Sequence, residues 1–167
     1  MLKKLAVGAA ALVATSSAAS AEQLVDSIHF LIPGGAGGGW DGTARGTGEA
    51  LTGAGMVGSA SYENMSGGGG GVAIGHLIEN ADSMDGTLMV NSTPIVIRSL
   101  QGVFPYNFSD LTMIAGTIGD YGALVVTPGS TTTLGDLVAA YTADPSSIAM
   151  GGGSVPGGMD HLIGAMV

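Results

Sequence analysis

The sequence contains no cysteine and very few cations. Lys3 and Lys4 are its only lysines, and Arg45 and Arg98 are its only arginines, against 13 acidic residues. The absence of cysteine excludes disulfides, thiol catalysis and cysteine metal sites. The acidic balance excludes nucleic-acid binding through phosphate neutralisation. Because the overall field repels anions, any bound anion must be held by short-range hydrogen bonds.

Other chemical signatures are also missing. No lysine follows Lys4, which excludes a P-loop lysine and a Schiff base from the rest of the chain. The three histidines, His29, His76 and His161, do not have the spacing of metal ligands. We therefore expect neither a metal nor a cofactor.

The N-terminus has the pattern of a secretory signal peptide. Lys3 and Lys4 form a basic start, residues 5–14 form an apolar run, and Ala19-Ser20-Ala21 fits the cleavage pattern. The apolar run is shorter than the roughly 20 residues of a membrane span. We predict cleavage after Ala21 and export, with no other transmembrane segment.

Apolar runs and turn signals alternate along the rest of the chain. Strands are predicted at residues 29–32, 57–62, 87–90, 111–117, 123–126 and 147–150. Helices are predicted at residues 42–51, 72–80 and 95–100, from Thr133 through Tyr141, and from about Met159. Thr133-Leu134-Gly135-Asp136 fits a capping pattern at the start of the fourth of these helices. This alternation predicts an α/β fold with a mostly parallel sheet.

Three glycine-rich loops separate these elements, at residues 33–41, 64–71 and 151–158. Each is predicted to follow a strand and to precede a helix. Unhindered backbone N–H groups at the positive end of a helix can capture an anion without a charged side chain. The carboxyl edge of a parallel sheet is also where α/β folds bind ligands.

Individual residues in the first loop have two interpretations each. Asp41 suits a helix N-cap, and Arg45, four residues later, can pair with it across one turn. Arg45 could instead meet a ligand carboxylate. Trp40, the only tryptophan, either walls a pocket or fills the core beneath the loop.

Two later positions and one motif are also ambiguous. Ser92 and Thr93 could donate hydroxyl hydrogen bonds to a ligand or form a turn before the following proline. Ser154 lacks the final glycine of a nucleophile elbow, and His161 is either its partner or a helix-surface residue. The pattern Gly37-x-Gly39-x-x-Gly42, with Glu63 beyond it, matches the dinucleotide fingerprint, but Asp41 would repel a pyrophosphate.

The stretch from Pro33 to Arg45, PGGAGGGWDGTAR, resembles the first ligand loop of the extracytoplasmic solute receptors of tripartite tricarboxylate transporters. The resemblance continues in order through Glu63-Asn64 with Gly67–Gly70, Asp85-Gly86-Thr87-Leu88, Phe104-Pro105-Tyr106, and Ser154 with His161-Leu162. Ser66 and Ala73 depart from the family, which usually has proline and glycine at these positions.

The resemblance implies a type II periplasmic binding protein with two lobes and a hinge. It places the signal peptide at residues 1–21, the first lobe at 22–120 and the start of an incomplete second lobe at 121–167. It implies a monomeric, non-catalytic receptor that binds a small carboxylate such as citrate and delivers it to integral-membrane permease subunits. The ligand-binding residues it implies are Gly37, Gly38, Gly39, Trp40, Asp41, Ser66, Gly67, Gly68, Gly69, Gly70 and Ser154. Ser92 and Thr93 join them as candidates from their hydroxyl groups alone. The alternative function is a secreted α/β enzyme that uses the glycine loops for a nucleotide or Ser154 for catalysis.

Overall fold

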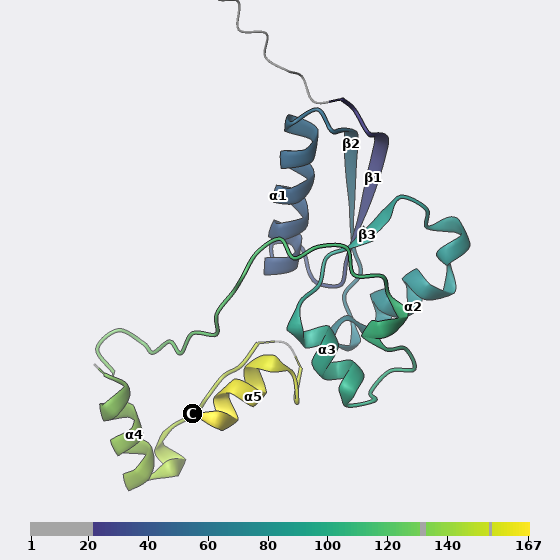
Figure 1. Cartoon of the computed structure of the whole chain (residues 1–167). Coiled ribbons are helices and arrows are strands. Elements are labelled where there is room, and N and C mark those ends of the chain that lie inside the picture. Colours follow the sequence, from purple (N-terminus) through teal and green to yellow (C-terminus); the bar gives the residue numbers. More distant parts are fainter. Residues whose placement is uncertain (1–21, 131–132, 154) are drawn as a thin grey trace, which may run out of the picture.

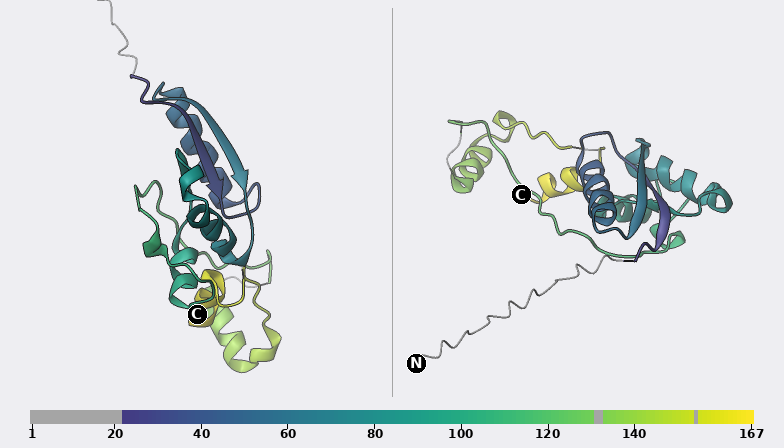
Figure 2. Two further views of the ribbon diagram at one scale, coloured as in Figure 1. Left: turned by 90° about the vertical axis from the view of Figure 1, so that its right-hand side faces the viewer. Right: turned by 90° about the horizontal axis from the view of Figure 1, so that it is seen from above.

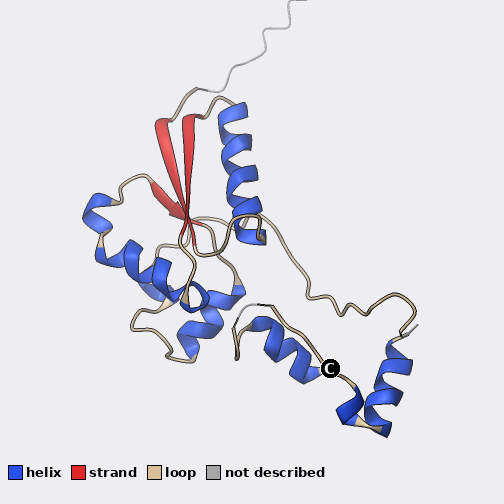
Figure 3. Cartoon of the chain, turned by 180° about the vertical axis from the view of Figure 1, so that it is seen from behind, coloured by secondary structure: helices blue, strands red, loops and turns tan. Residues whose placement is uncertain are grey.

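Three parallel strands form the sheet of this protein. A computed structural model describes residues 22–130, 133–153 and 155–167 (Figure 1). Strand β1 (Val25–Ile32) lies between β2 (Val57–Asn64) and β3 (Thr87–Met89), and all three run in the same direction (Figure 3). The α/β prediction with a parallel sheet is therefore confirmed. The predicted signal peptide lies outside the described residues.

The main core lies between the sheet and helix α1 (Gly39–Gly53), which runs alongside the strands in both views of Figure 2. Phe30 and Ile32 of β1 and Ala44 of α1 are fully buried there. The ring of Phe30 stacks on that of Tyr62 from β2, with centroids 5.5 Å apart. Alternate residues of β1 thus face α1, as a strand with period 2 requires.

Gly48 explains why a glycine-containing helix is stable at this position. A Cβ at Gly48 would overlap the hydroxyl of Tyr62 and lie 3.0 Å from the Cβ of Ala60. Glycine costs about 1 kcal/mol in a helix interior. Here the missing side chain lets α1 approach β2 closely, so tertiary packing offsets the weak propensity.

Shorter helices gather at the carboxyl end of the sheet. The α2 helix (Gly71–Glu79) follows β2, and α3 (Thr93–Leu100) follows β3. Ala73 and Ile74 of α2 and Ile95 of α3 are fully buried. The short 3-10 turns are η1 (Gly68–Gly70), η2 (Ala81–Ser83), η3 (Phe108–Asp110) and η4 (Pro145–Ser147). The predicted helices at 72–80 and 95–100 are confirmed with small shifts in their bounds.

The three strands predicted at 111–117, 123–126 and 147–150 are wrong. Residues 111–130, all of which the structure describes, form neither strand nor helix apart from a turn, and residues 148–150 have no regular structure. Tyr121 is 94% exposed and Val125 is 87% exposed. A strand needs a neighbour that satisfies its backbone groups, and no strand of the described residues lies beside these segments.

Two further helices follow this extended segment. The α4 helix (Leu134–Ala143) begins after Thr133, whose hydroxyl accepts a hydrogen bond from the N–H of Asp136, so the predicted cap is confirmed. It packs on the adjacent η4 turn and lies apart from the sheet (Figure 1). The α5 helix (Met159–Met166) starts where predicted and returns to α3. Within the described residues, no helix is long and apolar enough to cross a membrane.

Candidate functional site

The first glycine loop connects the buried end of β1 to the first turn of α1. The helix begins at Gly39 with Gly38 as its N-cap, three residues before the predicted start. The prediction that Asp41 is the N-cap is therefore wrong. Glycine serves at this position because the neighbouring loop turns back sharply, with the N–H of Gly38 donating to the carbonyl of Gly35 at 3.2 Å.

Asp41 instead joins three elements from inside the first helical turn. Its carboxylate is 5% exposed and accepts hydrogen bonds from the N–H of Gly37 at 2.9 Å, from Nε of Arg45 at 3.0 Å and from Nδ2 of Asn64 at 3.1 Å. The Asn64 amide also donates to the carbonyl of Gly34 at 3.0 Å. These contacts fix the loop against both α1 and the end of β2, and the predicted Asp41–Arg45 pair is confirmed.

The same contacts set the acidity of Asp41. The hydrogen bond from Arg45 is the largest cause that lowers the pKa of this carboxyl to about 2, and the Gly37 N–H adds to it. The pKa of Arg45 is raised by the same pair. Both groups therefore stay charged and paired across the physiological pH range. Arg45 is held by its hydrogen bonds to Asp41.

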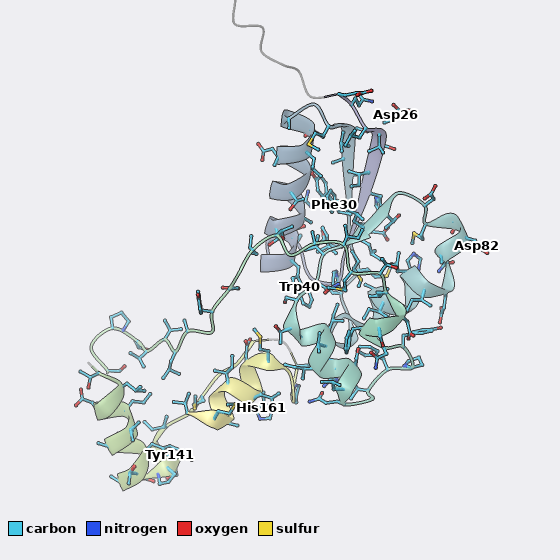
Figure 4. All side chains as sticks on the ribbon, in the orientation of Figure 1. Asp26, Phe30, Trp40, Asp82, Tyr141 and His161 are labelled. Carbon is cyan, nitrogen blue, oxygen red and sulfur yellow. The ribbon has the colours of Figure 1, made fainter. Side chains whose placement is uncertain are left out.

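Trp40 fills the core beneath the loop. Its ring packs against the cluster around Phe30, and a Cβ at Gly34 would lie 3.1 Å from it. Its Nε1 donates to the hydroxyl oxygen of Ser92 at 2.9 Å. Figure 4 shows Trp40 under the carboxyl end of the strands. Of the two interpretations, the structure favours core packing, and it gives Ser92 a protein partner at the start of α3.

The second glycine loop needs four consecutive glycines for its shape. Gly67, Gly68, Gly69 and Gly70 all have positive φ, from 59° to 147°. Only glycine adopts such a run without strain. A Cβ at Gly70 would also lie 3.0 Å from Cγ1 of Ile95, so α3 approaches this backbone directly.

The two loops meet at the carboxyl edge of the sheet. Asn64 bonds to the first loop, and a Cβ on Gly35 would lie 3.9 Å from the hydroxyl oxygen of Ser66. Among the described residues, no acceptor is found for the N–H groups of Gly39 and Trp40 or of Gly68 and Gly69. The predicted backbone donors therefore lie in one region. The exceptions are Gly37, whose N–H donates to Asp41, and Gly38 and Gly70, whose N–H groups donate to the carbonyls of Gly35 and Gly67.

The dinucleotide interpretation loses support from this geometry. The Asp41 carboxylate lies at the turn where a pyrophosphate would approach the backbone. Glu63 lies 3.5 Å from Nε2 of His29 on the neighbouring strand, so it has a partner within the sheet. Thr93 is the first residue of α3, and its role as a ligand residue stays a prediction.

The third glycine loop does not follow a strand, contrary to the prediction. Its described part contacts α3: Nη1 of Arg98 donates to the carbonyl of Pro156 at 3.2 Å, and Nε2 of Gln101 donates to that of Gly157 at 2.8 Å. His161 on α5 accepts the N–H of Gly157 at 2.8 Å and so fixes the start of its own helix. Ser154, and with it the proposed Ser154–His161 pairing, lies outside the described residues.

Two surface hollows lie away from the first loop. One, of about 700 Å³, is lined by residues 122–125, 150–153 and 155–156 and by residues of α5. The other, of about 540 Å³, is lined by Met65 and by side chains of α2 together with Tyr106. The hydroxyl of Tyr106 donates to Glu79 at 2.7 Å, and this contact raises the pKa of Tyr106. Neither hollow contains a residue of the first loop, whose residues 35–39 are exposed.

Arg98 was not predicted as a site residue, yet it lies against the second loop. A Cβ on Gly69 would lie 3.3 Å from its Cγ and 3.4 Å from its Nε. The sequence did carry a signal, because Arg98 is one of only two cations after residue 4.

No group of three metal-ligating side chains occurs in the described part of the chain. Comparisons with protein-family models, curated proteins and solved structures found no match.

Proposed function

We propose that this chain is the ligand-binding part of a periplasmic solute receptor. It captures a small carboxylate at its two early glycine loops and delivers it to integral-membrane permease subunits without chemical turnover. The observation that carries the proposal is the meeting of the two loops at the carboxyl edge of a parallel sheet. There, the described residues supply no acceptor for the N–H groups of Gly39, Trp40, Gly68 and Gly69.

Charge balance explains why backbone donors suit this protein. The acidic surface repels a free anion, and no lysine after Lys4 attracts one over a long distance. Short-range hydrogen bonds must therefore supply the affinity for the ligand. The dipole of a helix stabilises a carboxylate at the helix start by about 0.3–1 kcal/mol. Each direct hydrogen bond from a neutral N–H group adds roughly 1 kcal/mol. Four such bonds and the two helix starts together supply roughly 5–6 kcal/mol, which corresponds to a dissociation constant on the order of 0.1 mM.

The Asp41 contacts support the proposal by holding the donors in place. A loop that is already fixed loses little conformational entropy when a ligand binds. Asp41 joins Gly37, Arg45 and Asn64, so the first loop is tied to α1 and to the strand that leads into the second loop. Asp41 then acts as a support of the binding loop rather than as a ligand contact.

The finer features of the proposal rest on the resemblance in the sequence. These are the choice of a carboxylate over another small anion, the type II two-lobed fold with lobes at 22–120 and 121–167, the monomeric state, and the permease partner. The predicted signal peptide agrees with a periplasmic location. Closure of the two lobes would be a hinge motion driven by contacts made only in the bound state.

Gly39 offers the sharpest test of the binding loops. A Cβ at Gly39 would meet nothing within 4 Å, whereas one at Gly38 would lie 3.1 Å from the carbonyl oxygen of Gly35. Gly39→Asp therefore adds a negative charge beside the donors without a clash, and Gly39→Asn is its neutral, equally sized control. An acidic residue in the first helical turn also favours the helix.

The experiment measures thermal stabilisation and calorimetric affinity with citrate, succinate, benzoate and NAD. We expect one carboxylate class to stabilise the protein, by about 2.7 kcal/mol at 100 times its dissociation constant. Gly39→Asp should weaken that binding at least about tenfold more than Gly39→Asn, because the added carboxylate and the ligand carboxylate carry like charges and repel. Stabilisation by NAD alone, or equal affinity of the two variants, would contradict the proposal.

A further inference from the structure

We propose that Arg98 is the charged anchor for one carboxylate of the ligand, at the side of the second glycine loop. This inference rests on the function proposed above and adds a side chain to a site otherwise made of backbone donors. Arg98 is on α3, and its Cγ and Nε lie within 3.4 Å of the position that a Cβ on Gly69 would take, as does the Cγ2 of Val155.

The first reason is that Arg98 has no carboxylate partner. All 13 acidic residues lie in the described part of the chain, and the ion pairs found there are Asp41–Arg45 and Glu63–His29. The other arginine, Arg45, is thus paired, while Arg98 is not. A cation that is partly withdrawn from water is unfavourable unless an anion compensates it. In a protein with 13 acids and two described cations, an unpaired arginine marks a place where an outside anion fits.

The second reason is that some nitrogens of the Arg98 guanidinium have hydrogen-bond acceptors and others do not. Nη1 donates to Oε1 of Gln101 at 3.0 Å and to the carbonyl of Pro156 at 3.2 Å. Nε is buried and has no hydrogen-bond partner, and no acceptor for Nη2 is found among the described residues. Nε and Nη2 form the edge of the guanidinium that binds a carboxylate through two parallel hydrogen bonds. One edge is therefore held by protein and the other is left for a ligand.

The third reason is the position of that edge. A Cβ on Gly69 would lie 3.4 Å from Nε of Arg98, so the guanidinium lies next to a loop whose N–H groups at Gly68 and Gly69 also lack described acceptors. Backbone and side-chain donors thus converge. Val155 also lies close to this point, since its Cγ2 would be 3.3 Å from a Cβ on Gly69. A carboxylate reaches Nε when the Val155 side chain moves aside.

Isothermal titration calorimetry of the full chain with citrate and succinate tests this role. Arg98→Gln should weaken the carboxylate affinity by about 10- to 100-fold, the effect expected for charge-assisted hydrogen bonds, and Arg98→Lys should give a smaller loss because lysine lacks the paired donors. Ser83→Asp, on the exposed η2 turn, is the charge-matched control, since it changes the net charge by the same amount. It should bind as the unmodified protein does.

Gln101→Ala separates a ligand contact from a purely structural role. It removes the hydrogen bond to Gly157 and one contact of Arg98 but keeps the guanidinium charge. Its affinity should stay within about threefold of the unmodified protein. An equal loss in Gln101→Ala and Arg98→Gln would overturn the proposal, because Arg98 would then act only by holding the Pro156–Gly157 segment.

Modification by phenylglyoxal tests the unmodified protein and needs no folded variant. Citrate should slow the modification of Arg98 and leave that of Arg45 unchanged, as mapped by mass spectrometry. If the protein binds citrate or succinate but Arg98 is not protected and Arg98→Gln binds normally, the Arg98 anchor is wrong while the receptor function stands. If no carboxylate binds, the receptor function fails and the anchor fails with it.

Discussion

Residues 22–110 and residues 111–167 contain similar apolar runs that end in different structures. Residues 30–32 are buried between two parallel neighbours and helix α1. Residues 123–126 have comparable apolar character but remain exposed and without regular structure. Gly158 is the one buried residue among the described residues of 111–167. The difference lies in the presence of partners, because strand preference largely reflects packing against neighbouring strands.

The comparison also separates the parts of the proposed site. The backbone donors and Asp41 lie in residues 22–110, where the core and sheet position them. The contribution from residues 111–167 is the contact of Pro156 and Gly157 with α3. Stability and ligand binding should therefore respond strongly to changes in the first region and weakly to most changes in the second.

The largest effect is expected from truncating the core. Phe30→Ala should lower the free energy of unfolding by about 3–5 kcal/mol, because it leaves a cavity between the sheet and α1. Tyr121→Ala, at a residue that is 94% exposed, should change it by less than about 0.5 kcal/mol. Urea denaturation followed by circular dichroism measures both. A similar loss in the two variants would show that residues 111–167 share the core.

A matched pair of glycines gives the next largest effect. Gly70 and Gly129 both have positive φ, of 101° and 82°. Gly70→Ala adds a Cβ 3.0 Å from Ile95, so strain and crowding together should cost about 2–4 kcal/mol. Gly129→Ala meets nothing within 4 Å and should cost about 1 kcal/mol or less. Equal losses, measured in the same denaturation assay, would mean that backbone strain alone decides.

The pH dependence of stability tests Asp41. Its pKa is lowered in the folded protein from 3.8 to about 2, so the stabilisation is complete above pH 4 and is lost as the pH falls toward 2. Asp41→Asn should remove most of this acid-induced loss and lower stability at pH 7. The exposed Asp120 carboxylate, which accepts from the N–H of Tyr121, supplies the control Asp120→Asn. Unchanged acid unfolding of Asp41→Asn would contradict the role of Asp41 as the support of the loop.

The smallest effect is expected at the start of α4. Thr133→Ala removes the hydroxyl that caps this helix and should cost about 1 kcal/mol of local helix stability. Because α4 contacts mainly η4, the main unfolding transition should stay within about 0.5 kcal/mol. Hydrogen exchange of the α4 amides should show faster opening in this variant, while exchange in β1 is unchanged. Slower folding or lower stability of the sheet would show that α4 is coupled to the core.

The sequence predicted the elements whose partners are nearby in the chain. Residues 29–32, 57–62 and 87–90 became strands because each has a parallel neighbour within the first 90 residues. The Thr133 cap was predictable because capping is local. Three predicted strands failed because no strand of the described residues lies beside them. The role of Asp41 failed because the helix begins at Gly39, which no local pattern distinguished from Gly42.

The candidate site, like the fold, could be predicted from the sequence only in part. Glycine clusters after apolar runs correctly indicated that the two early loops meet at one edge of the sheet. Their shape depends on tertiary contacts, such as Asn64 with Asp41 and Ser92 with Trp40, which join residues 23 and 52 positions apart. Arg98 was missed for the same reason, because its unpaired state becomes visible only when all the acids are placed.

Amide resonances of the glycine loops test the central claim most directly. A titration of isotope-labelled protein with citrate and succinate, followed by nitrogen–proton correlation spectra, reports each backbone N–H separately. The account predicts saturable shifts, concentrated at Gly39, Trp40, Gly68 and Gly69, for at least one of these carboxylates. Shifts confined to residues 122–125 and 150–165 around the larger hollow, or no shifts at millimolar ligand, would contradict it.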